Sequence, residues 1–143
     1  MRPLLLLLAL LPVLGFAAEK PHTPKPGSKE RTDILNAIRD PLEDALHQEI
    51  IFRVEHLKVQ DGWAFLIGTP RTKADKAIDY KKTRFKWEAE EMDEILVALM
   101  RFKRGRWYVV THGLFSTDVW WIGLDKDYKA PSAIFPKLPK DTE

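Results

Sequence analysis

The stretch DEILVALMRFKRGRWYVVT, residues 93–111, decides how this chain folds. One apolar run occupies residues 95–100 and a second one residues 107–110, and a short basic turn with Gly105 lies between them. This pattern is typical of a β-hairpin, because glycine adopts the positive φ of tight turns without steric cost. A buried helix is the competing interpretation of the first run. The aromatic and β-branched residues of the second run favour the hairpin.

The register of this hairpin follows from its turn. With Arg104 and Gly105 as a two-residue loop, one face pairs Phe102 with Trp107, Met100 with Val109 and Ala98 with Thr111. The other face carries Val97, Leu99 and Arg101 against His112, Val110 and Tyr108. Both faces of the first strand are largely apolar, so we expect both to be covered, as in a central strand.

The first residues have the pattern of a secretory signal peptide. Arg2 precedes a leucine-rich run, and small residues follow at Gly15, Ala17 and Ala18. The run is shorter than the roughly twenty apolar residues that a membrane-spanning helix needs. We therefore expect residues 1–17 to be removed by cleavage after Ala17, with Ala18 as the alternative position. This predicts export, to the periplasm in the first place and to the extracellular space as the alternative, and a mature chain without a membrane span.

The composition restricts the chemistry that the chain can perform. It contains no cysteine, which excludes disulfides, thiol nucleophiles and thiolate metal sites. Lys and Arg number 23 against 21 Asp and Glu, so the charge balance indicates neither nucleic acid nor a membrane surface as partner. We expect a flexible Pro-rich linker at residues 18–27, a single domain at residues 28–136 and a disordered tail at residues 137–143, with no cofactor.

The domain is expected to begin with a helix that proline interrupts. Apolar residues recur at helical spacing at Ile34, Leu35 and Ile38. Ser28 or Thr32 could cap this helix. Asp40 and Pro41 would end it and start a second short helix that runs to about His47. The result would be a kinked or broken helix with one apolar side.

A second hairpin is predicted at Asp61-Gly62, between strand-like runs at residues 50–60 and 63–69. Asp-Gly between such runs is a strong hairpin signal. In the first of these strands, the apolar side chains that would point inward are at even positions at first, 52 and 54, and at odd positions later, 57 and 59. A β-bulge near Glu55 and His56 would produce that change and would bend the sheet.

The remaining segments complete an α+β fold. We expect a loop at residues 70–82, a short edge strand at residues 83–87, a last helix from about residue 116 to residue 128, and an apolar anchor at Ile134 and Phe135. A helix followed by antiparallel hairpins predicts a curved four- to five-stranded sheet wrapped on the helix, as in a cystatin-like roll. A small β-barrel is the alternative.

Several motifs spread over most of the domain carry a family resemblance. They are Arg31…Arg39-Asp40-Pro41, Phe52-x-Val54-x-x-Leu57-x-Val59 with Gly62-Trp63-Ala64-Phe65, Arg106-Trp107-Tyr108-Val109, and Thr117-Asp118-Val119-x-Trp121. In these motifs the chain resembles a group of small exported bacterial proteins of uncharacterised function. The motifs mainly define the fold, and the resemblance implies no activity and no catalytic residue.

The first candidate binding surface is basic and aromatic. Residues 71–86 contain seven Lys and Arg against two Asp. Within and beside this stretch, Tyr80, Arg84, Lys86 and Trp87 could hold an anionic cell-wall polymer or an acidic envelope protein. The alternative is a solvated loop that the following acidic run neutralises. Export and the balanced total charge disfavour nucleic acid.

Adjacent tryptophans form the second candidate surface. On a helix, Trp120 and Trp121 would point about 100° apart, so a narrow buried face cannot accept both. One of them could contact a sugar ring or a partner protein. Packing of both against the sheet is the alternative.

Catalysis has one weak candidate pair. His112 and Asp118 could approach each other as a base and its orienting carboxylate. No G-x-S-x-G serine accompanies them, and the histidines lack metal-ligand spacing, so we expect no metal site. The sequence favours a non-enzymatic binding or accessory protein of the cell envelope, with a small enzyme that uses His112 and Asp118 as the alternative.

Overall fold

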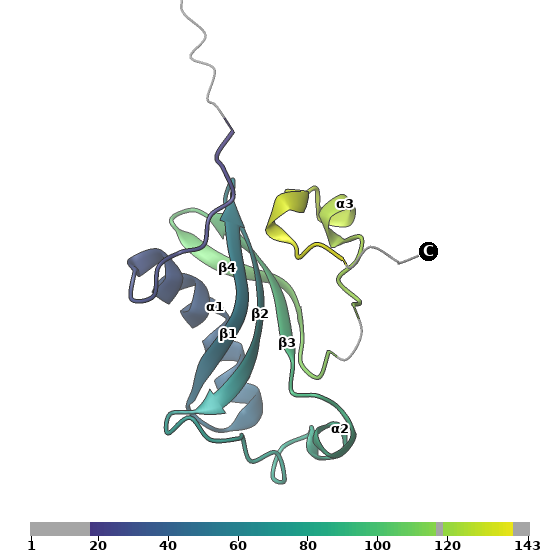
Figure 1. The fold of residues 1–143 in the computed structure, drawn as a ribbon. Helices are drawn as coiled ribbons and strands as arrows, with labels where there is room; N and C mark the ends of the chain where they lie inside the picture. The colour runs from purple at the N-terminus through teal and green to yellow at the C-terminus, as the bar shows by residue number, and fades with distance from the viewer. Residues whose placement is uncertain (1–17, 117–118, 139–143) are drawn as a thin grey trace, which may run out of the picture.

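The computed structural model describes residues 18–116 and 119–138. Its strands are β1 (Ile50–Gln60), β2 (Trp63–Thr72), β3 (Leu96–Lys103) and β4 (Arg106–Gly113), and its helices are α1 (Lys29–Leu46), α2 (Lys86–Glu91), α3 (Leu124–Tyr128) and the 3-10 helix η1 (Ser132–Ile134). The four strands form one antiparallel sheet in the order β1-β2-β3-β4 (Figure 1). The predicted α+β fold is confirmed. The sheet is open rather than a barrel, because β1 and β4 are its two edges.

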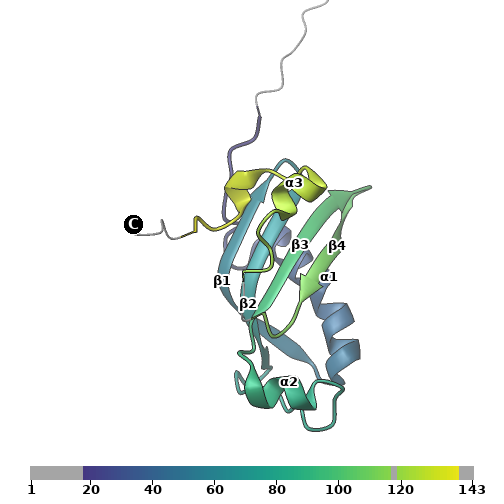
Figure 2. The ribbon, with the colours of Figure 1, turned by 90° about the vertical axis from the view of Figure 1, so that its right-hand side faces the viewer.

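The sheet carries a separate apolar cluster on each face. α1 packs on one face, and the segment that contains α3 and η1 packs on the other (Figures 1 and 2). The sheet residues under the C-terminal segment include Phe65, Val97 and Leu99. Because both faces of β3 are covered, five consecutive residues from Leu96 to Met100 are buried, as expected for a central strand.

The hairpin of β3 and β4 turns at Arg104 and Gly105, as predicted, with φ of 52° and 80°. Phe102 lies opposite Trp107 and Met100 opposite Val109, which confirms the first part of the predicted register. The register then shifts by one residue at a bulge around Val110. Ala98 therefore lies opposite His112 and Leu99 opposite Thr111, so the predicted pairs beyond the bulge are wrong. The shift moves His112 to the face on which α1 packs.

The first hairpin has the predicted two-residue turn and the predicted bulge. Asp61 and Gly62 connect its strands with φ of 50° and 74°. Val54 pairs with Gly68 and His56 with Ile67, so Glu55 is left unpaired. β2 extends to Thr72 and passes through Pro70, where a loop was predicted. A proline fits there because Gly68 is the last residue of β2 that pairs with β3, so Pro70 has a strand on one side only.

α1 is one helix of 18 residues with Pro41 inside it, not the two pieces that were predicted. Ser28 is its N-cap and accepts a hydrogen bond from the Arg31 amide (3.3 Å). The buried side chains recur four residues apart at Ile34, Ile38, Leu42 and Leu46. This row continues across Pro41 onto the same apolar cluster. Burial on both sides therefore keeps the helix together despite the donor that proline lacks.

The C-terminal segment covers the second face with less helix than predicted. α3 begins at Leu124, because Gly123 adopts a φ of 92° immediately before it. Ile134 is fully buried and Phe135 packs against the same cluster, as predicted for the last apolar anchor. His56 on β1 fixes the position of this segment by donating a hydrogen bond from Nε2 to the Ile134 carbonyl oxygen (2.7 Å).

Residues 18–27 run beside the free edge of β1. The amide of His22 donates to the Val59 carbonyl (2.9 Å), and the Val59 amide donates back to His22 (2.8 Å). Pro24 is buried. These contacts place the segment against the domain, while its predicted flexibility stays a prediction. Residues 1–17 and 139–143, where the signal peptide and most of the tail were predicted, lie outside the described residues.

Within the described residues, no helix has both the length and the apolar character that a bilayer crossing requires.

Candidate functional site

The basic and aromatic stretch forms a helix rather than the predicted edge strand. Residues 86–91 are helical and constitute α2, which lies at the end of the molecule away from the hairpin tips (Figures 1 and 2). The alternation of Phe85 and Trp87 suggested a strand, but no sheet edge lies beside it, and Ala and Glu at residues 88–91 are good helix formers. None of the residues of α2 is buried. Ala89 packs against the apolar cluster beneath α1, and the other side chains of α2 are exposed to a partner.

The exposed side chains around α2 are cationic and aromatic. We name Lys81, Lys82, Arg84, Lys86 and Trp87 the α2 patch. The Trp87 side chain is 71% exposed, and the Lys86 Nζ lies 5.1 Å from the centre of its ring. Arg84 lies over the ring of Phe85 at 4.7 Å. No carboxylate of the described residues lies within ion-pair distance of these four cations, so the acidic run does not neutralise them by contact.

Tyr80 does not belong to this surface. It is 5% exposed, and its ring lies 5.1 Å from that of Phe115 in the cluster beneath α1. Burial is the main cause that raises the pKa of the Tyr80 hydroxyl, and the nearby carboxylate of Glu94 raises it further. Of the four residues predicted for this surface, the structure brings Arg84, Lys86 and Trp87 together and places Tyr80 in the core.

The adjacent tryptophans separate between core and surface. Trp121 is 8% exposed and packs against Phe65, with ring centres 5.5 Å apart. Trp120 is 38% exposed, and its indole Nε1 donates a hydrogen bond to the Ser116 hydroxyl (2.7 Å). The two rings therefore do not form one aromatic surface.

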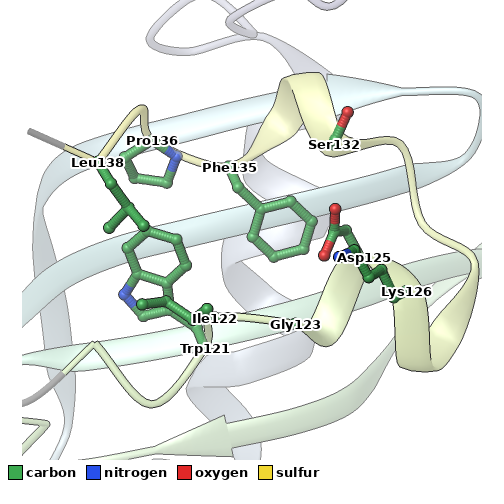
Figure 3. Close-up of a pocket in the computed structure, with 9 residues that line it drawn as sticks. All are labelled: Trp121, Ile122, Gly123, Asp125, Lys126, Ser132, Phe135, Pro136 and Leu138. Atoms are coloured by element: carbon green, nitrogen blue, oxygen red, sulfur yellow. The ribbon is translucent and has the colours of Figure 1, made fainter. Parts of the chain in front are cut away.

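A groove of about 350 Å³ lies beside Trp121 (Figure 3). Trp121, Phe135 and Leu138 form its apolar part, and Asp125 and Lys126 lie at its other end. Trp120 does not line it. The groove continues the aromatic cluster on the second face of the sheet.

His112 lies on the edge strand β4, where its ring is accessible to solvent but partly covered by neighbouring groups. Partial burial and the positive charge of Arg84 lower the pKa of its imidazole. Within the described part of the chain, no side chain forms a hydrogen bond with His112. Asp118, its proposed partner, lies outside that part. The described geometry therefore gives this histidine no orienting group.

Over residues 18–116 and 119–138, no three side chains of His, Asp or Glu converge closely enough to hold a metal ion.

Sequence reasoning did not identify a second groove, at the tips of the two hairpins. Phe102 and Trp107 line it together with acidic residues from α1. The available signal was the aromatic pair next to the turn at Arg104-Gly105, because such a pair lies at an exposed hairpin end. The contribution of α1 depends on tertiary packing and could not be predicted from the sequence.

Comparison of the chain with protein-family models, with curated proteins and with solved structures found no match.

Proposed function

We propose that this protein is a non-enzymatic binding domain of the bacterial cell envelope, exported by cleavage after Ala17. Its α2 patch contacts an anionic cell-wall polymer. The observation that carries the proposal is Trp87, a large aromatic side chain that is 71% exposed beside cations without ion-pair partners in the described chain.

The chemistry of the α2 patch suits a polymer that combines negative charge with sugar rings. Arg84 and Lys86 supply positive charge at close range, and the face of Trp87 supplies a surface for a ring. α2 packs on the domain through Ala89, so an exposed Trp87 on the same helix adds nothing to the core. Binding would remove this apolar surface from water.

The acidic side chains of α2 limit how the polymer can lie. Glu88, Glu90 and Glu91 follow the cations along the chain and would repel an anion that extends along the helix. We therefore expect contact on the side of Arg84 and Lys86. An acidic envelope protein would meet the same charges, and the experiment below separates it from a polymer.

Retention on immobilised heparin, a sulfated polysaccharide, tests the proposal, with a neutral dextran resin as reference. We expect the protein to bind heparin and to elute at lower salt when Arg84→Glu and Lys86→Glu are combined. Trp87→Ala should weaken binding about tenfold, from roughly 1–2 kcal/mol for the lost aromatic contact, without any change in charge. Poly-glutamate, which has charge and no sugar ring, should bind independently of Trp87.

A matched pair of substitutions at the other end of the molecule controls for net charge. Lys103→Glu with Arg104→Glu changes the charge by the same amount at the tip of the β3–β4 hairpin. If both double variants lose heparin binding equally, binding reflects total charge and the α2 patch is not the site. Retention that does not respond to Trp87→Ala would argue for an acidic protein partner instead of a polymer.

The export step has its own test. Protein isolated from the cell envelope should begin at Ala18 by N-terminal sequencing. A first residue within 1–17 would contradict the cleavage site.

A further inference from the structure

A groove of about 400 Å³ lies between the first turns of α1 and the tips of the two hairpins. Its apolar lining consists of Phe102, Trp107, Val59 and Gly62. The rings of Phe102 and Trp107 lie with their centres 5.4 Å apart, and Phe102 is 44% exposed. The groove thus presents an accessible aromatic pair.

Backbone contacts hold this aromatic pair in place. Phe102 and Trp107 are cross-strand partners next to the two-residue turn. The Phe102 amide donates to the Gly62 carbonyl (2.8 Å), which ties the tip of one hairpin to the other. A Cβ at Gly62 would lie 3.8 Å from the Phe102 Cβ, at ordinary van der Waals distance, so the two hairpin tips are neighbours there.

The charged lining is mostly acidic and partly fixed. It consists of Glu19, Glu30, Asp33 and Lys29. His22 holds two of the carboxylates, with Nε2 2.9 Å from Glu30 Oε2 and Nδ1 3.1 Å from Glu19 Oε1. Glu19 also accepts a hydrogen bond from the Asp61 amide through Oε2 (3.1 Å).

Among the described residues that line this groove, Lys29 is the only lysine or arginine. It pairs with Asp33 one turn away, and its side chain is 87% exposed. Such an exposed ion pair contributes little, so Lys29 can turn into solvent when a ligand arrives. Against the three carboxylates, the N-terminus of α1 adds about half a positive charge, and His22, which contacts Glu19 and Glu30, adds a further charge when it is protonated at low pH.

We propose that this groove binds a small organic cation, with a primary or quaternary ammonium group attached to an apolar body. The ammonium group would lie between the carboxylates and the faces of Phe102 and Trp107, and the apolar body would cover the aromatic pair. Aromatic rings and carboxylates both attract a cation, and both reject an anion. The site is separate from the α2 patch and does not depend on the proposed function.

Three probes of similar shape test the charge selectivity: phenethylamine, which is cationic at neutral pH, 2-phenylethanol, which is neutral, and 3-phenylpropionate, which is anionic. Binding is followed by calorimetry and by the tryptophan fluorescence of the purified protein. We expect phenethylamine to bind with a dissociation constant on the order of 1 mM, as a ligand of this size allows. The alcohol should bind about tenfold more weakly, and the carboxylate should not bind.

Four variants then locate the site. Asp33→Asn should weaken phenethylamine binding about threefold, and Phe102→Leu, which keeps the apolar volume and removes the π face, about fivefold. Lys29→Gln should strengthen it, because the competing ammonium is gone. Glu88→Gln on α2 is the control, with the same loss of charge outside the groove, and should change nothing.

Four results would overturn the proposal. They are equal binding of the alcohol and the amine, no saturable binding of phenethylamine, an unchanged affinity in Asp33→Asn, and a weaker affinity in Lys29→Gln. Far-ultraviolet circular dichroism of each variant ensures that a loss of binding is not a loss of fold.

Discussion

Replacing Pro41 with alanine should make the domain more stable. Pro41 lies inside the 18-residue helix α1 and is exposed, so its ring contributes no core packing. A proline in a helix interior costs about 3 kcal/mol relative to alanine, because it lacks the N–H donor and clashes with the preceding turn. Alanine also gives the unfolded chain more freedom, which costs about 0.4–1 kcal/mol. The net expectation for Pro41→Ala is a gain of about 2 kcal/mol.

A substitution at the preceding residue distinguishes one helix from two. If Asp40 capped a second helix, Asp40→Ala would cost about 1 kcal/mol, because a capping side chain would be lost. Asp40 is instead an interior helical residue without a side-chain hydrogen bond in the described chain. Alanine has the higher helix propensity there, so Asp40→Ala should stabilise by about 0.5 kcal/mol. The two arrangements therefore predict opposite signs.

Urea unfolding of the purified variants, followed by circular dichroism and tryptophan fluorescence, measures both effects. Pro26→Ala is the matched control, since Pro26 is exposed and precedes the helix. That change should be neutral or slightly destabilising, because only the unfolded chain gains freedom. A free energy of unfolding that falls or stays constant in Pro41→Ala would refute the continuous helix, as would destabilisation by Asp40→Ala.

Two further predictions concern the sheet and the N-terminal segment. Gly68→Ala should destabilise the domain by about 2 kcal/mol in urea, because the new Cβ would lie 2.6 Å from the Arg53 carbonyl oxygen, which no side-chain rotation can move. Gly105→Asn, at a turn position with a φ of 80° and open space around it, should be nearly neutral. The Glu30 carboxylate raises the pKa of His22 above its ordinary 6.5, which means that the protonated imidazole stabilises the folded state. This stabilisation is fully present below pH 6.5 and is lost as pH rises through the raised pKa. Because the pair is partly exposed, the stability difference between the protein and its His22→Gln variant should shrink by about 0.5 kcal/mol over that window, and a constant difference would contradict the linkage.

The sequence predicted features that local rules determine. Asp61-Gly62 and Arg104-Gly105 both form the predicted two-residue turns. Glycine at the second position adopts a positive φ without steric cost in both turns, and aspartate is also favoured at the first position of the Asp61 turn. The bulge at Glu55 was predictable because it reverses which side chains point inward. The bulge at Val110 left no such trace, since two adjacent valines read as apolar in either register.

The errors arose where tertiary contacts override local preference. Pro41 predicted a helix end, but the buried row on both sides of it keeps α1 continuous. The alternation of Phe85 and Trp87 predicted a strand, but this segment pairs with none of the four strands of the described sheet. For the candidate site, charge counting found the cations around α2. The burial of Tyr80 and the groove beside Phe102 depend on how distant elements meet.

The two segments that cover the faces of the sheet lie on opposite sides of the strands along the chain. α1 precedes all four strands along the chain, so one face can close as soon as the strands pair. The other face is covered only by residues that follow β4, among them Trp121 and Ile134. Without residues 121–134, the side chains of Phe65, Val97 and Leu99 would be open to water. A truncated chain that ends after β4 would therefore expose one apolar face of its sheet and should be prone to aggregate.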